Sequence, residues 1–368
     1  TDQLMTSLYI HIPFCIKKCK YCDFVSYAGC EELFDAYIEC LCGEMRQYRG
    51  ERIATVFIGG GTPSLLNASQ AGRLLEAVGN AFCVEPQAEF TVECNPGSLD
   101  FEKLRVYRDY GVNRISIGLQ SASAAELKLL GRCHSYEQFL QAYALARQVF
   151  DNINVDLISG LPGQTRAGHM RTLKEVTALA PEHLSCYSLI VSEGTLLAEE
   201  IERGDLIMPP EELDREIYND TKAYLEAHGY QRYEISNFAK PGMECRHNLR
   251  YWLRGEYIGI GCAAHSFLGG FRFCNPESLQ VYMNGGRAAE KSRVTPQEAV
   301  EETLMLQLRL SAGVSLAELK KLGCDLLRER KKEIERLLEL HLIWLSQTHL
   351  GLTDEGFHVA NAVIRRLV

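Results

Sequence analysis

Three cysteines in one short segment are the feature of this sequence that points most directly to chemistry. Cys15, Cys19 and Cys22 have the spacing C-x3-C-x2-C and follow an apolar segment, Leu8–Ile12. Three thiolates can bind three irons of a cubane [4Fe–4S] cluster and leave the fourth iron without a protein ligand. A metal site with an open position can bind and transform a small molecule. The spacing therefore predicts a reactive iron–sulfur site.

Three other interpretations of the triplet are a chance cluster, a zinc site and a disulfide. Chance has some weight in a chain that contains 14 cysteines. A zinc site needs a fourth Cys or His at short spacing, and the nearby candidates, His11 and Cys30, fit poorly. So many cysteines without a pairing pattern favour a reducing compartment, where disulfides are rare. We therefore prefer the cluster and expect a cytoplasmic protein.

The composition narrows the class of protein. The chain has 368 residues and a formal net charge of −9, which argues against a nucleic-acid surface as the main function. It contains no apolar run long enough to span a membrane, so we expect membrane contact only indirectly, through partner proteins. Residues 1–7 show no basic segment followed by an apolar one, as a secretory signal has.

The pattern over residues 7–190 alternates short apolar segments with longer amphipathic ones. The expected strands are Leu8–Ile12, Thr55–Ile58, Glu89–Val92, Arg114–Ile117, Asn154–Ile158 and His183–Leu189. The expected helices between them are Leu33–Tyr48, Ala68–Val78, Phe101–Tyr110, Tyr136–Val149 and Arg166–Leu179. Six consecutive β-then-α units predict an α/β fold whose parallel sheet curls into a full or partial barrel.

The rest of the chain has a different pattern. One more helix is expected over residues 211–228, and residues 230–275 look irregular, with many aromatics and glycines. We place a domain boundary at residue 285, giving a core over 1–285 and a mostly helical domain over 286–368. The expected elements of that domain are helices Pro296–Leu310, Ser315–Leu322, Asp325–Leu340 and Asp354–Leu367, with a hairpin of 342–344 and 349–352. This order resembles a winged helix.

Glycines and a carboxylate stand at the ends of the second and third expected strands. The second strand runs into Gly59-Gly60-Gly61-Thr62, where glycine lets the backbone approach a ligand and leaves main-chain groups free to bind it. Glu93 ends the third strand and could accept bonds from a ribose diol, or simply cap the next helix. Ligands bind at this end of parallel strands, so both features are candidate site elements.

The next two strands also end in polar residues. Gln120 follows the fourth strand, and Arg132 lies in the segment after it, where a guanidinium could clamp a carboxylate. Asp156 lies within the apolar fifth strand. A buried carboxylate needs a polar partner, so Asp156 is either structurally paired or part of a ligand site.

Together these segments resemble the radical S-adenosylmethionine (SAM) superfamily, in its oxygen-independent coproporphyrinogen III oxidase-like branch. The matching segments are residues 9–15, 59–63, 93–96, 118–121, 131–132 and 156–164. The resemblance implies a partial (β/α)6 radical-SAM barrel with a winged-helix-like C-terminal domain. It implies Cys15, Cys19 and Cys22 as cluster ligands. It also implies SAM contacts with Tyr9, Tyr21, Gly60, Gly61, Thr62, Glu93, Gln120, Arg132 and Asp156.

Two features favour the haem chaperone group of this branch. The oxidases have a fourth cysteine where this chain has Phe24, which puts oxidase activity in doubt. In addition, His247-Asn-Leu-Arg-Tyr251-Trp252 is similar to the haem-associated motif H-N-x-x-Y-W of the chaperone group. An imidazole can ligate haem iron, and flat aromatic rings suit a porphyrin. The alternative is that His247 is a structural histidine and its neighbours are core aromatics; His265 is a weaker candidate ligand.

We therefore predict a haem chaperone that carries a [4Fe–4S] cluster and SAM, and passes haem to apoproteins such as respiratory enzymes. The competing prediction is a radical-SAM enzyme that acts on a tetrapyrrole with the same cofactors and an electron donor. A winged-helix regulator is a third class, disfavoured because no basic stripe is visible. The sequence does not identify the haem acceptor.

Overall fold

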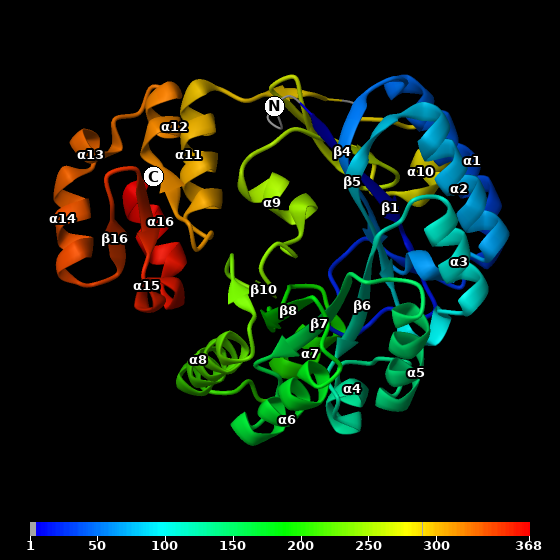
Figure 1. Cartoon of the computed structure of the whole chain (residues 1–368), viewed down its shortest axis with the longest axis horizontal. Helices are drawn as coiled ribbons and strands as arrows, with labels where there is room; N and C mark the ends of the chain where they lie inside the picture. Colours follow the sequence, from blue (N-terminus) through cyan, green and yellow to red (C-terminus); the bar gives the residue numbers. More distant parts are fainter. Residues whose placement is uncertain (1–4, 289) are drawn as a thin grey trace.

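The computed structural model of the protein describes residues 5–288 and 290–368. A large α/β core and a smaller, mostly helical C-terminal unit lie side by side, with helix α9 (Arg246–Trp252) between them (Figure 1). In the described residues no helix has the length and apolar character needed to cross a membrane.

Six parallel strands form the centre of the core. Each pairs with the next in chain order, and together they belong to one twelve-stranded sheet. They are β1 (Thr6–Ile12), β4 (Arg52–Gly60), β5 (Cys83–Cys94), β6 (Arg114–Gln120), β7 (Ile153–Ser159) and β8 (His183–Ser188). All six lie where the sequence predicts strands, and the partial (β/α)6 architecture is confirmed.

Helices connect these strands and cover one face of the sheet (Figure 1). Several begin at a residue whose side chain accepts a hydrogen bond from the first turn, namely Asn67, Asp100, Ser123, Ser135 and Thr165. Such caps satisfy amides that would otherwise lack a partner. The helices are α1 (Phe34–Met45), α2 (Ala68–Ala81), α3 (Phe101–Asp109), α4 (Ala124–Leu129), α5 (Tyr136–Arg147), α6 (Arg166–Thr177), α7 (Leu196–Glu202) and α8 (Glu211–Ala227).

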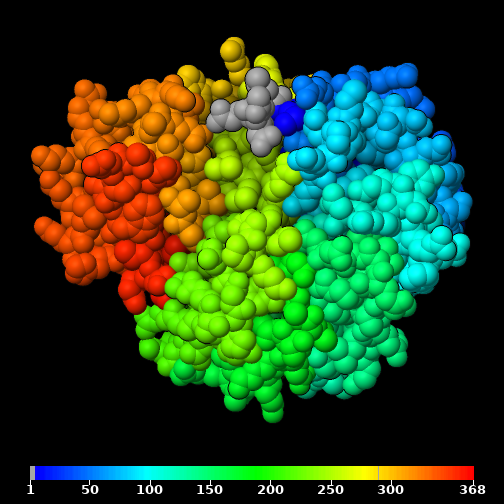
Figure 2. Space-filling model, viewed as in Figure 1, coloured from blue at the N-terminus to red at the C-terminus, as the bar shows by residue number. Residues whose placement is uncertain are grey.

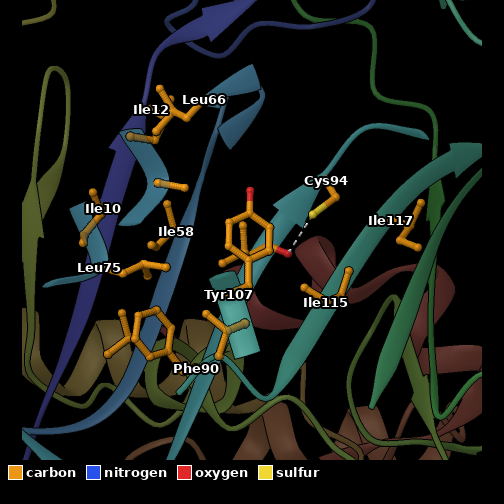
Figure 3. Close-up of a cluster of buried hydrophobic side chains, with 14 of the residues drawn as sticks. Ile10, Ile12, Ile58, Leu66, Leu75, Phe90, Cys94, Tyr107, Ile115 and Ile117 are labelled. Carbon is orange, nitrogen blue, oxygen red and sulfur yellow. Dashed lines mark hydrogen bonds between the residues drawn. The ribbon is translucent and has the colours of Figure 1, made fainter. Parts of the chain in front are cut away.

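The two faces of the parallel strands differ in character. Ile10, Ile58 and Phe90 point toward the helices, where they pack with Leu75 of α2 and Tyr107 of α3 (Figure 3). Side chains alternate along a strand, so the residues between them face the concave interior of the partial barrel. Those residues are largely polar and buried; they include Ser7, Thr55, Glu89, Arg114, Asn154 and His183.

Residues 230–275 are not irregular, so that prediction is wrong. Short strands here extend the sheet at both edges: β10 pairs with β8, and β11 pairs in parallel with β1. Strands of two to four residues are too short to show a periodic pattern in the sequence, and some of them pair with strands far away in the chain. The strands of this segment are β9 (Gln231–Arg232), β10 (Asn237–Ala239), β11 (Tyr257–Ile260), β12 (His265–Leu268) and β13 (Phe271–Cys274); α10 (Leu279–Met283) and β14 (Ser292–Arg293) follow it.

The C-terminal unit has its own hydrophobic core and a three-stranded sheet in the order β15-β17-β16. Two predicted helices are each divided, because the backbone leaves helical geometry at Arg330 and Val359. The elements are α11 (Pro296–Gln307), β15 (Val314–Ser315), α12 (Leu316–Lys321), α13 (Leu326–Glu329), α14 (Lys331–Glu339), β16 (Ile343–Leu345), β17 (His349–Leu352), α15 (Asp354–His358) and α16 (Ala360–Leu367). The exact domain boundary at residue 285 stays a prediction.

Ionic and aromatic contacts join the C-terminal unit to the core. Asp354 lies 3.1 Å from Lys222 and 2.9 Å from Arg232, and the Arg232 guanidinium lies 4.0 Å above the Phe357 ring. Figure 2 shows this unit, in orange and red, packed against the green segment that contains α8. The two parts therefore share an interface anchored on α8 and β9.

A buried carboxylate ties α1 to the sheet extension. Glu44 accepts hydrogen bonds from Gly261 N–H at 3.0 Å, from Asn275 Nδ2 at 2.6 Å and from the Tyr282 hydroxyl at 2.7 Å. Three donors around one buried carboxylate compensate much of its lost hydration.

Replacing Glu44 should therefore destabilise the core. We expect Glu44→Leu to cost about 3 kcal/mol, because it removes the carboxylate that accepts from three buried donors. The exposed Glu39→Leu, on the same helix, should cost less than about 0.5 kcal/mol. Thermal unfolding followed by circular dichroism measures both, and equal midpoints for the two variants would contradict this account of α1.

Candidate functional site

A cavity of about 590 Å³ opens at the carboxyl ends of the parallel strands. It brings together most of the residues predicted from strand ends and loops. Those that line it are Cys15, Cys19, Tyr21, Cys22, Gly60, Gly61, Thr62, Glu93, Gln120, Arg132 and Asp156. Residues from five strands and their loops thus meet in one place, as the parallel arrangement requires.

The cysteine loop forms one wall of the cavity. It follows β1 and contains the short strands β2 (Phe14–Cys15) and β3 (Tyr27–Ala28), which pair with each other. Cys22 N–H donates to the Cys19 carbonyl at 3.2 Å, which bends the segment between them into a turn. All three thiols are free, and in the described residues no three His, Cys, Asp or Glu side chains are grouped to hold a single metal ion.

The surroundings of the thiols suit a group that supplies positive charge. Burial raises the pKa of Cys15, and it raises the pKa of Cys22 to about 11, so both thiols keep their protons when no metal is bound. The Thr62 hydroxyl lies 3.7 Å from Cys15 Sγ, and Arg132 Nη1 lies 3.6 Å from Cys19 Sγ. Iron is bound by thiolates, so iron binding would release the thiol protons. Thiols are the ligand type that an iron–sulfur cluster needs, and all three line the same cavity.

The glycine segment packs too tightly for side chains. A Cβ at Gly61 would lie 2.5 Å from the Phe14 carbonyl oxygen, and Gly60 has φ of +113°. The main-chain donors are not free, in contrast to the prediction. Gly61 N–H donates to the Ile12 carbonyl and Thr62 N–H donates to the Phe14 carbonyl. The segment therefore holds the cysteine loop against β4. A ligand with N–H or O–H donors would bind to the carbonyl oxygens of this segment.

Glu93 is a half-buried residue of the cavity wall. It accepts a hydrogen bond from Gly60 N–H at 3.1 Å and caps no helix, since Asp100 caps α3. Burial, together with the nearby Asp156 carboxylate, raises its pKa to about 8. A cationic ligand in the cavity would favour the ionised form, as a sulfonium or an ammonium group does.

Asp156 also faces the cavity, and it has structural partners as well. Asn154 Nδ2 donates to it at 2.7 Å and the Ser116 hydroxyl donates to it at 3.1 Å. Burial raises its pKa, although these donors oppose the shift. Both interpretations of Asp156 made from the sequence are thus compatible with its position.

Gln120 and Arg132 approach the cavity from β6 and the loop after α4. Gln120 is buried with φ of +71°, a left-handed conformation that costs energy for a residue with a side chain. Arg132 Nη2 donates to the Gly118 carbonyl at 2.8 Å, and its buried Nε has no protein partner. The Nε–H group is therefore available for a ligand carboxylate, whereas Nη1 and Nη2 already have contacts in the protein.

Tyr9 lies below the cavity and does not line it. Its hydroxyl lies 2.9 Å from His11 Nδ1, and its ring stacks on Phe57 at 6.3 Å between centroids. His11 Nε2 in turn lies 2.9 Å from the Val25 carbonyl oxygen, so the ring holds the end of the cysteine loop. The structure therefore gives Tyr9 a place in the barrel interior behind the site.

No residue of α9, the helix with the H-N-x-x-Y-W motif, lines the cavity. The helix packs against β4 and α11, and Glu89 of β5 binds its first turn (Figure 1). His247 is buried, with Nδ1 2.8 Å from the Thr55 hydroxyl and Nε2 2.9 Å from the Tyr251 hydroxyl. Burial lowers its pKa to about 3. Both ring nitrogens are thus occupied in this conformation, and iron ligation would require His247 to leave these partners. Trp252 is half-buried, and His265 lies exposed on β12.

Comparison with known proteins agrees with this geometry. The family model of the radical SAM superfamily matches residues 9–176, and that of the HemN C-terminal domain matches residues 294–359. The chain is 36% identical to "Heme chaperone HemW" of Lactococcus lactis, over 100% of this chain and 98% of that protein. It is 37% identical to "Heme chaperone HemW" of Bacillus subtilis, over 98% of each. The chain belongs to the HemW family of radical SAM proteins.

A solved structure supports the fold of this HemW-family chain. Coproporphyrinogen III oxidase (HemN) from Escherichia coli superposes with a TM-score of 0.85, covering 100% of this chain and 91% of that one. The two sequences are 24% identical, so the likeness concerns the fold. The α/β radical-SAM core with a HemN-like C-terminal domain is thereby confirmed.

Several residues that position the site of this HemW-family member were not predicted from the sequence. Glu89 accepts hydrogen bonds from the main-chain N–H groups of Arg246 and His247 at 2.9 Å, and so fixes the start of α9. The Thr55 hydroxyl contacts the ring of His247. The Asn154 side chain donates a hydrogen bond to the Asp156 carboxylate. The sequence held one signal for these residues: polar side chains at inward-facing positions of apolar strands. Buried polar side chains need hydrogen-bond partners.

The raised pKa of Glu93 predicts how the stability of the metal-free protein depends on pH. The ordinary pKa of a glutamate carboxyl is 4.5, and that of Glu93 in the folded protein is about 8. Between these values the folded state binds a proton that the unfolded state releases, so this contribution to stability falls as the pH rises.

We therefore expect Glu93→Gln to make the decline of the unfolding midpoint between about pH 5 and 8 shallower than in the wild type. The exposed Glu76→Gln should keep the wild-type slope. Thermal scans at several pH values measure this effect. Parallel curves for wild type and Glu93→Gln would contradict the burial argument.

Proposed function

We propose that this protein is a haem chaperone that holds a [4Fe–4S] cluster and SAM at the cavity and passes haem to apoproteins. The observation that carries the proposal is whole-chain similarity to proteins named "Heme chaperone HemW". Phe24, in place of the oxidases' fourth cysteine, and the H-N-x-x-Y-W motif support it.

The cavity supports the cofactor assignment. In our proposal Cys15, Cys19 and Cys22 hold the cluster, and Glu93, Asp156 and Arg132 provide the charges that suit a zwitterionic, cationic nucleoside. The remaining proposed SAM contacts that line the cavity are Tyr21, Gly60, Gly61, Thr62 and Gln120. Tyr9, which the resemblance also implied, lies behind the cavity and would act there only through His11. When bound, this pair of cofactors supplies one-electron cleavage of a sulfonium bond, for which an electron donor is required.

Cysteine variants test the cluster. After anaerobic reconstitution with iron and sulfide, we expect Cys15→Ala, Cys19→Ala and Cys22→Ala each to lose most of the visible absorption of the cluster, since each removes one of three iron ligands. Cys133→Ser is the matched control, because Cys133 lines the same cavity outside the triplet. Full iron content in all three triplet variants would refute the assignment.

Haem uptake tests the proposed function itself. We expect the reconstituted wild-type protein to bind haem stably, as seen in its absorption spectrum, and to transfer it to a haem-free acceptor protein. An unchanged haem spectrum after mixing would contradict the proposal. Conversion of coproporphyrinogen III to protoporphyrinogen IX under anaerobic assay would instead establish the enzyme alternative.

The motif on α9 is the proposed haem-associated element, with His247, Tyr251 and Trp252. His247→Ala tests its role, and loss of stable haem binding would support ligation. Because His247 is hydrogen-bonded on both nitrogens, the thermal midpoint of this variant must be measured beside haem uptake. Loss of haem binding with an unchanged midpoint separates ligation from a structural effect.

A further inference from the structure

Large apolar side chains stand exposed around the mouth of the cavity. Ile16, Phe24 and Ile190 are 58%, 62% and 78% exposed, and all three line the cavity. Exposed apolar side chains gathered at one cavity mouth mark a binding surface more often than scattered ones do. None of the three is among the residues that we assign to the cluster or to SAM.

These side chains come from two loops that are fastened together. The cysteine loop provides Ile16 and Phe24, and the segment after β8 provides Ile190. The Ser192 hydroxyl donates to Asp23 at 2.8 Å, and Leu197 N–H donates to the Lys20 carbonyl at 2.9 Å. The bond between Asp23 and Ser192 places Phe24 and Ile190 close to the junction of the loops. Hydrogen bonds between the two loops therefore hold the apolar side chains of the mouth together.

The same mouth carries a cation. Lys17 is exposed and lines the cavity beside Ile16. Asp23, the nearby carboxylate, already accepts the hydrogen bond from Ser192. A flat apolar ligand with acidic side chains would match this combination, because its rings cover the aromatic and aliphatic surface while a carboxylate meets the ammonium group.

We propose that the tetrapyrrole docks over the cavity mouth, with its face on Phe24 and Ile190 and one propionate near Lys17. This inference rests on the proposed function, and it names a docking position distinct from α9. The H-N-x-x-Y-W helix offers no exposed imidazole, whereas the mouth offers exposed apolar area. Phe24, the residue that departs from the oxidase pattern, thereby acquires a role of its own.

Variants of exposed apolar side chains at the mouth and outside it test this position. In cluster-reconstituted protein we expect Phe24→Ser and Ile190→Ser each to weaken haem binding about tenfold, since each removes apolar contact area. The matched controls are Phe101→Ser and Ile207→Ser, which are exposed but do not line the cavity. They should bind haem within about twofold of wild type, measured by absorbance titration.

The propionate contact has its own test. We expect Lys17→Gln to weaken binding of haem but to leave binding of haem dimethyl ester unchanged, because the ester carries no carboxylate. Equal weakening for both ligands would overturn the assignment of Lys17.

The outcomes separate this inference from the proposed function. If the wild type binds no haem, the proposed function fails. If the wild type and both mouth variants bind haem with equal affinity while His247→Ala does not, the chaperone proposal stands and the docking position is refuted. Weakening in the mouth variants alone, with iron content unchanged, supports docking at the mouth.

Discussion

Alternation along six parallel strands is the constraint on which the rest of the structure depends. One set of side chains packs under the helices, so the other set must line the concave interior. In this chain the second set is largely polar, and the environment shifts its ionisation: the pKa of Glu93 is raised to about 8 by the loss of water and by the nearby Asp156 carboxylate. Removing charge from water is costly, so a ligand that supplies positive charge would favour the ionised form of Glu93.

The interior also joins two regions that are far apart in the sequence. At the carboxyl ends of the strands, the cysteine loop is held by His11 and by the packing of Gly61 against Phe14. Nearer the amino ends of β4 and β5, Thr55 and Glu89 form the hydrogen bonds that hold α9. Phe57 lies between them, stacked on Tyr9 and, at 5.1 Å, on His247. The proposed cofactor site and the helix with the H-N-x-x-Y-W motif thus share one wall of aromatic and polar side chains.

Much of the site could be predicted from the sequence because its residues stand at the ends of strongly patterned strands. Parallel strands bring such ends together, so Glu93, Gln120 and Asp156 meet at one cavity without any knowledge of distant contacts. The position of α9 could not be predicted, because it depends on pairs such as Thr55 with His247, which are separated by 192 residues. The strands of residues 230–275 were missed for a related reason: they are too short to show a period, and the edges of the sheet determine them.

Our proposal as a whole requires that a cluster with one open iron share this cavity with SAM. Electron paramagnetic resonance of the reduced, reconstituted protein, recorded before and after SAM is added, observes this contact at the iron itself. We expect a [4Fe–4S]⁺ signal whose g values shift on addition of SAM. A signal that SAM leaves unchanged, at concentrations where binding is shown independently, would refute the shared site.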